Sequence, residues 1–150
     1  MPIFEPLSSD PPLRLRPEIG ELDVLVGFVE EFGERHCWAI SDTQAFSLAA
    51  EELFANTLRH GQSSASLIEF SMMSDNRSAS ACYSDDGLAF DPTAFPEVYT
   101  TLPIEQRPIG GLGIHFIRRT MQTFIYQREN VRNLLRFGRA LKAPKDTPAS

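Results

Sequence analysis

Three stretches of the chain repeat apolar residues at the spacing of three to four that is typical of an amphipathic helix. The first covers about residues 17–36, the second starts with Ser41 or Asp42 as its N-cap and ends at Gly61, and the third follows Gly113. The side chains expected to face a core are Ile19, Leu22, Val26, Val29 and Phe32, with Leu25 and Phe28, in the first stretch, Phe46, Ala49, Ala50, Leu53 and Leu58 in the second, and Ile114, Ile117 and Met121 in the third. The pattern therefore predicts three helices that each bury one face.

Shorter stretches of alternating or β-branched and aromatic residues predict strands. They cover Leu13–Arg16, residues 64–74, Ser78–Tyr83, Thr123–Gln127 and Asn133–Leu141. Between Asp85 and Gly111 no period is sustained and four prolines break any helix, which is typical of a lid or a binding loop. Helices and strands in this mixed order predict an α/β sandwich rather than a doubly wound sheet.

The composition fits one globular domain of 150 residues, of which 42% are hydrophobic. No apolar run approaches the roughly 18 residues of a membrane span, and no secretory signal is visible at the N-terminus. We therefore expect a cytoplasmic protein with no membrane partner. Cys37 and Cys82 cannot build a disulfide framework or a zinc site by themselves, and we expect both to be reduced and buried.

The charged residues are unevenly distributed along the chain. Residues 1–112 contain 6 Lys or Arg and 18 Asp or Glu, whereas residues 113–150 contain 8 and 2. The pI of about 5.0 argues against direct binding of nucleic acid. Arg132 and Arg136 share one face of a predicted strand, so we expect a folded basic surface that meets an acidic protein partner or a second subunit.

The second predicted helix carries Glu52, Asn56 and His60 on one stripe, because they recur every four residues. Asn is a poor residue for the interior of a helix, so its place calls for a reason. The amide oxygen of Asn56 is a hard ligand that suits Mg²⁺, and the carboxylate of Glu52 can orient or deprotonate a hydroxyl group. A solvated polar face explains the same stripe without chemistry, and the helix alone favours that explanation.

Two glycine segments flank the irregular stretch. Asp85 ends a predicted strand, where it can accept a hydrogen bond from an exocyclic amine, and Gly87 allows the backbone to approach a planar ring. Asp-Gly is also common in simple turns. The third helix opens with Gly110-Gly111-Leu112-Gly113, whose backbone N–H groups favour phosphate. A flexible hinge is the alternative for this second segment.

Taken in order, the three segments resemble the signature of the GHKL ATPase superfamily, whose domain is the Bergerat fold. Glu52-x-x-x-Asn56 is similar to its N box, Asp85-x-Gly87 to its first glycine box and Gly111-x-Gly113 to its second. The closer resemblance is to the anti-sigma-factor serine/threonine kinases and covers about residues 12–142. It rests also on the sequences His60-Gly61, Phe90-Asp91-Pro92 and Ile117-Arg118, and it continues into Met121, Tyr126 and Asn133.

The resemblance implies an α/β (α+β) two-layer sandwich with a mixed, mostly antiparallel sheet of about five strands and three helices on one face. It divides the chain into a flexible lead-in at residues 1–11, an ATP-binding kinase domain at residues 12–142 and a disordered tail at residues 143–150. Residues 92–110 would form a lid over the nucleotide.

The resemblance also implies a role for each motif residue. Asn56 would hold Mg²⁺, Asp85 would read the adenine of ATP, and Gly87 would admit the ring. The residues that would wrap the phosphates are Gly110, Gly111, Leu112 and Gly113, with Arg107 as the nearest candidate for a contact with the terminal phosphate. Glu52 would be the catalytic base that activates a serine hydroxyl of a partner protein.

Partners follow from the resemblance alone. A protein of this kind phosphorylates a serine of a STAS-domain anti-anti-sigma protein and sequesters a sigma factor, and a homodimer is a further expectation. Two alternatives stay open at this point. One is a nucleotide-gated partner-switching module without significant catalysis, and the other is a detached ATPase domain of the histidine-kinase type.

Overall fold

The computed structural model describes residues 11–60, 65–94 and 111–142. The elements in these ranges are β1 (Leu13–Leu15), η1 (Ile19–Glu21), α1 (Leu22–Arg35), α2 (Ile40–His60), β2 (Ile68–Ser74), β3 (Ser78–Asp85), η2 (Pro92–Ala94), α3 (Gly111–Thr120), β4 (Thr123–Glu129) and β5 (Arg132–Ala140). The predicted tail, nearly all of the lead-in and most of the predicted lid lie outside the described residues, as do Arg107 and Gly110.

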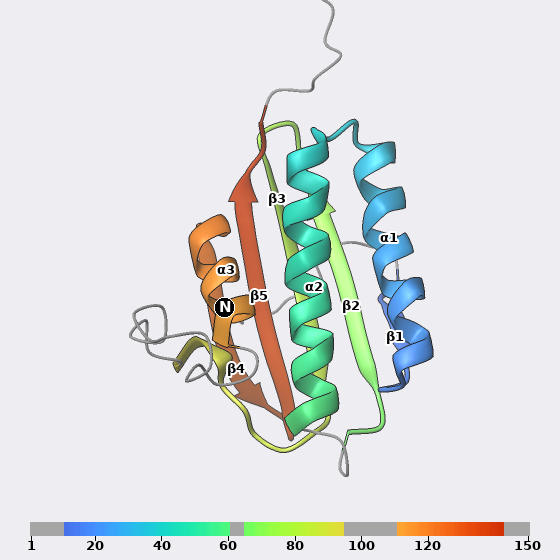
Figure 1. The fold of residues 1–150 in the computed structure, drawn as a ribbon, viewed down its shortest axis with the longest axis vertical. Coiled ribbons are helices and arrows are strands. Elements are labelled where there is room, and N and C mark those ends of the chain that lie inside the picture. The colour runs from blue at the N-terminus through green and yellow to red at the C-terminus, as the bar shows by residue number, and fades with distance from the viewer. Residues whose placement is uncertain (1–10, 61–64, 95–110, 143–150) are drawn as a thin grey trace, which may run out of the picture.

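The strands form one sheet in the order β1-β2-β3-β5-β4, and each neighbouring pair is antiparallel. Figure 1 shows α1, α2 and α3 side by side in front of this sheet, with α2 in the middle. The predicted two-layer α+β sandwich is therefore confirmed. None of the helices in the described ranges combines the length and the apolar content that crossing a bilayer requires.

The core lies between α2 and the sheet. Strand alternation turns Phe70 of β2, Tyr83 of β3 and Phe137 of β5 toward the helices, and all three are buried. Among the predicted inward positions of the second and third helices, Leu58 is half-buried and the others are buried. Ile19 is an exception at 72% exposure, because the first α-helix begins only at Leu22, after a short 3₁₀ turn.

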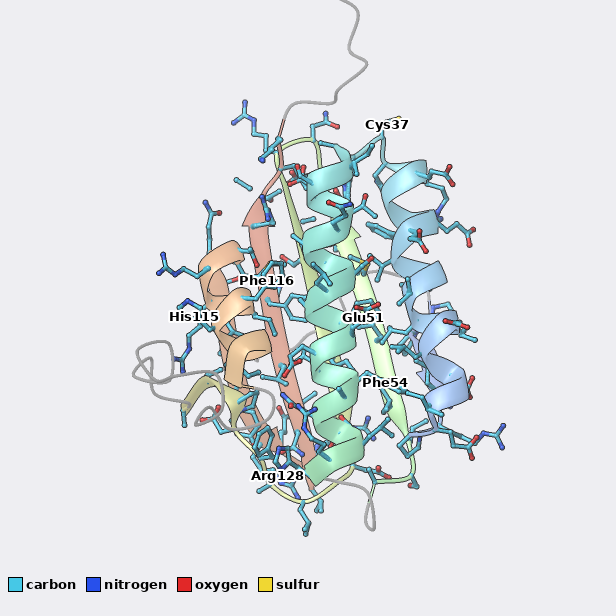
Figure 2. All side chains as sticks on the ribbon, in the orientation of Figure 1. Cys37, Glu51, Phe54, His115, Phe116 and Arg128 are labelled. Atoms are coloured by element: carbon cyan, nitrogen blue, oxygen red, sulfur yellow. The ribbon has the colours of Figure 1, made fainter. Side chains whose placement is uncertain are left out.

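Cys37 is exposed, so the expectation of two buried cysteines was wrong for this residue. It stands at the turn between α1 and α2 (Figure 2) with φ at 55°, a left-handed conformation that usually favours glycine. The Trp38 and Cys37 N–H groups donate to the carbonyls of Gly33 and Glu34, and the Trp38 ring packs against Phe32. These contacts form a Schellman cap, which places the cysteine outside the core.

Asp42 is not the N-cap that the sequence suggested, because α2 already begins at Ile40. Its carboxylate is fully buried and contacts two residues at the end of β5 and just after it. The N–H of Lys142 donates to Oδ2 at 2.9 Å, and Arg139 Nε lies 3.3 Å from Oδ1 as an ion pair. The start of α2 is thereby joined to the end of β5.

Candidate functional site

A small pocket lies where α2 ends, between this helix, the end of β3 and the start of β5. Its lining residues are Leu53, Asn56, Thr57, His60, Tyr83, Asp85, Leu88, Phe90, Pro92, Asn133 and Leu135. Apolar and aromatic side chains make up most of the wall, and a few polar groups converge within it. This combination is typical of a binding site for a small molecule.

Asp85 is buried at the end of β3 and accepts three hydrogen bonds. The N–H of Gly87 and the Nδ2 of Asn133 each donate to Oδ1 at 2.9 Å, and the Thr57 hydroxyl lies 2.8 Å from Oδ2. The bond from Gly87 is the side-chain turn that an Asp-x-Gly sequence favours. A carboxylate has about four acceptor positions, so roughly one remains for an N–H donor in the pocket.

The hydroxyl groups of Tyr83 and Thr57 form a chain of hydrogen bonds that ends on the Asp85 carboxylate. Thr57 Oγ1 has one proton, and its neighbours Asp85 Oδ2 and the Leu53 carbonyl can only accept. Tyr83, 2.7 Å away, therefore donates to Thr57. Burial raises the pKa of Tyr83 well above its ordinary value, which keeps this donor protonated.

Asn133 connects the loop after β3 to the last strand. Its Nδ2 donates to Asp85 and to the Leu88 carbonyl, while its Oδ1 accepts from the Phe90 N–H at 3.1 Å and from the Tyr126 hydroxyl at 2.6 Å. Three of these contacts, with Asp85, Leu88 and Phe90, hold the first glycine segment against the sheet. Asn133 was not among the predicted site residues.

Arg128 supports the same loop from the neighbouring strand. Figure 2 shows it at the end of the molecule where α2 ends, and its Nη1 donates to the Gly87 carbonyl at 2.8 Å and to Asn133 Oδ1 at 3.2 Å. The register of β4 and β5 places Arg128 opposite Asn133. The position of Gly87 is thus set by residues more than forty positions later in the chain.

The second glycine segment lies directly against Glu52. A Cβ built on Gly113 would be 2.0 Å from Glu52 Cδ and 2.2 Å from Oε2, so only glycine leaves room for the carboxylate. Burial raises the pKa of Glu52, and the nearby Arg59 guanidinium offsets part of that rise. The structure therefore brings together the predicted base and the segment predicted to wrap phosphates.

Asn56 is buried one turn after Glu52. Its Oδ1 accepts a hydrogen bond from Arg59 Nη2 at 2.5 Å, and its Nδ2 has no acceptor among the described residues. An amide oxygen that already faces a cationic group has the chemistry of a hard-cation ligand. Within the described ranges, no group of three or more His, Cys, Asp or Glu side chains is arranged so that it could hold a metal ion.

His60 closes the end of the pocket rather than reaching toward Glu52. Its ring stacks on Phe90 with centroids 4.1 Å apart and an interplanar angle of 14°. Burial, with a smaller contribution from Arg59, lowers the pKa of His60 and favours the neutral ring. His60 and Phe90 together form an aromatic wall.

The remaining predicted residues can be placed only in part. Gly111 begins α3, and Leu112 follows it in the helical backbone. Arg107 and Gly110 lie outside the described residues, so their predicted contacts with phosphate stay predictions.

The basic C-terminal part of the chain makes several contacts within the molecule. Arg132 Nη2 lies 3.0 Å from Glu69 Oε1 and donates to Ser84, and Arg118 donates to the Thr93 carbonyl. Arg139 pairs with the buried Asp42, on the helix side of the sheet. Two of these late cations, Arg132 and Arg139, thus form ion pairs with anions from the first half of the chain.

The model of one protein family, described as a histidine kinase-like ATPase domain, matches residues 15–139. The matched range contains all of the site residues described above. None of the curated proteins compared with this chain matches it.

Proposed function

The chain belongs to the histidine kinase-like ATPases of the GHKL superfamily, and we propose that it is an anti-sigma regulatory factor that binds ATP with Mg²⁺ and phosphorylates a serine of a STAS-domain partner. The observation that carries the proposal is the contact between Glu52 and Gly113. It sets a carboxylate with a raised pKa against the helix N-terminus at which phosphate is expected.

The pocket supports recognition of the adenine ring. Leu53, Leu88 and Leu135 offer apolar contact to a flat ring, and the acceptor position left on Asp85 suits the exocyclic amine. Burial of Asp85 makes this bond selective, because a base that presents only an acceptor there would leave the carboxylate unpaired.

Asn56 would hold Mg²⁺ through Oδ1, and the metal when bound would neutralise charge on the phosphates. Glu52 accepts the proton of the partner's serine hydroxyl while the serine oxygen forms its bond to the γ-phosphorus and the bond to the departing ADP breaks. Burial makes Glu52 a stronger base than an exposed glutamate, since it raises the pKa.

The partners and the setting are proposed from the resemblance to anti-sigma-factor kinases. We infer that a cytoplasmic STAS-domain anti-anti-sigma protein supplies the serine, that a sigma factor is the second client, and that the protein acts as a homodimer. The strand face that carries Arg132 and Arg136 is a reasonable place for an acidic partner, although Glu69 balances part of its charge.

Two measurements test the proposal. Binding of ATP should depend on Mg²⁺ in the wild-type protein and lose that dependence in Asn56→Ala; unchanged magnesium dependence would refute the metal role. Phosphate transfer to a purified STAS-domain protein should fall by about 10²-fold or more in Glu52→Gln, as expected for loss of a general base. The matched control is Glu51→Gln, because Glu51 is the neighbouring carboxylate on α2 (Figure 2), whereas the atoms that an added Cβ on Gly113 would meet belong to Glu52.

The same assays separate the alternatives. Nucleotide-dependent partner binding without phosphate transfer would favour the partner-switching module. Transfer to a histidine of another chain would favour the ATPase domain of a histidine kinase.

A further inference from the structure

Arg59 contacts both functional side chains of α2, yet neither the sequence motifs nor the proposed function assigns it a role. Its Nη2 donates to Asn56 Oδ1 at 2.5 Å and lies 3.4 Å from Glu52 Oε1. The three residues are spaced by four and three positions, which places them on one face of the helix. A single guanidinium therefore bridges the predicted metal ligand and the predicted base.

The orientation of the Asn56 amide follows from its neighbours. A flipped amide would direct its N–H groups at a guanidinium, which can only donate, so Oδ1 must face Arg59. The other end of the amide, Nδ2, is buried and meets no acceptor among the described residues. A buried asparagine with a purely structural role usually has hydrogen-bond partners for both its oxygen and its nitrogen, so this side chain is suited to binding a ligand.

The bridging contact competes directly with metal binding. Mg²⁺ bound to Asn56 Oδ1 would share this oxygen atom with the Arg59 guanidinium, and two cations held on one atom repel each other. The Arg59 side chain is 32% exposed and stands near the end of α2, so it has room to swing into solvent. The Glu52 side chain is 17% exposed and would lose its counter-charge when that happens.

We infer that Arg59 occupies the metal position in the nucleotide-free protein and that Mg²⁺ arriving with the nucleotide must displace it. This inference rests on the proposed function and deepens it. Arg59 acts as a positioning residue. It stabilises the half-buried Glu52 carboxylate and the buried Asn56 amide while the site is empty, and it raises the Mg²⁺ concentration at which nucleotide binds.

The test is calorimetric titration of the full chain with ADP at a series of Mg²⁺ concentrations. In Arg59→Met the Mg²⁺ midpoint should fall by about tenfold, the effect of removing one charge-assisted hydrogen bond that the metal otherwise has to break. Methionine is a good helix former and fills a similar volume, so the fold should tolerate it. The matched control is Arg119→Met, which removes an exposed cation from α3 that contacts His115 and neither Asn56 nor Glu52.

Repeating the titrations at high salt separates contact from long-range charge. Competition for one oxygen atom persists at high salt, whereas a distant electrostatic effect is screened. A second measurement is the melting temperature of the nucleotide-free protein, which should fall in Arg59→Met because Glu52 loses its counter-charge.

The outcomes distinguish the two proposals. A wild-type protein that binds no nucleotide at any Mg²⁺ concentration would overturn the proposed function. A wild-type protein with magnesium-dependent binding, but with the same midpoint in Arg59→Met, would overturn the inference about Arg59 alone. A shift that vanishes at high salt, or that Arg119→Met reproduces, would also overturn it.

Discussion

Replacing Gly113 by alanine tests whether the second glycine segment has to make room for the Glu52 carboxylate. The added Cβ would lie 2.0 Å from Glu52 Cδ, whereas ordinary contact begins at 3.4 Å, so the carboxylate has to move by about 1.4 Å. Because the group that moves is the end of a flexible side chain, the fold should accommodate it. Alanine also favours a helix over glycine by roughly 0.5–1 kcal/mol, so stability should hold or rise slightly.

Catalysis should respond differently from stability in the same variant. A catalytic group displaced by about 1 Å can cost a factor of about 10² in rate. We therefore expect phosphate transfer to the STAS-domain partner to fall about 10²-fold, while the free energy of unfolding measured in urea changes by less than about 1 kcal/mol.

Two controls isolate the steric contact. Gly27→Ala adds a methyl group on α1 where nothing lies within 4 Å, so it should raise stability by about 0.5–1 kcal/mol without changing the rate. In a Glu52→Ala background, Gly113→Ala should cause no further loss of activity, since the group it displaces is gone. Wild-type transfer by Gly113→Ala would refute the reasoning, and so would a loss of stability well beyond 1 kcal/mol.

Three further predictions concern stability. Asp42→Ala should lower the free energy of unfolding by about 3–5 kcal/mol, because it leaves the buried Nε of Arg139 and the N–H of Lys142 without their partner. Arg14→Ala at an exposed ion pair should cost under about 1 kcal/mol, and equal effects of the two variants in urea unfolding would contradict this. Cys37→Gly should raise stability by about 1 kcal/mol, since glycine adopts the left-handed conformation at φ 55° without strain, and an unchanged melting temperature would count against it. Burial raises the pKa of Asp86, but hydrogen bonds from the Ser66 hydroxyl and from the N–H groups of Ser66 and Leu67 outweigh it and bring the pKa to about 2. At pH values above its ordinary pKa of 3.8, the Asp86 carboxylate therefore contributes stability, and this contribution is lost as the pH falls toward 2. Asp86→Asn should accordingly make the stability less dependent on pH between about 4 and 2.

Much of the fold was predictable because the signals are local. Apolar positions repeat along each helix and alternate along each strand, so the sequence identified the inward faces of α2 and α3 and placed all five strands. The error at Asp42 has its cause in a distant contact. Asp42 resembles an N-cap, but its carboxylate bonds the backbone of Lys142, one hundred residues later. No local pattern contains that contact.

The sequence by itself determined which residues of the site share a helix face, because the spacing of Glu52 and Asn56 fixes their direction once the helix forms. It also placed Asp85 at the end of a strand. One weak signal for Asn133 was present, since a polar residue stands in line with Leu135 and Phe137 on the buried face of β5.

Only the tertiary structure decided how these pieces meet. Inserting β5 between β3 and β4 brings Asn133 against Asp85, and packing α3 beside α2 sets Gly113 against Glu52. Arg59 is the clearest case. Its spacing allows the side chain to contact Asn56, but the spacing would equally allow it to point into solvent. That choice depends on burial, which makes an unpaired carboxylate and amide costly, and burial arises only when the whole chain has folded.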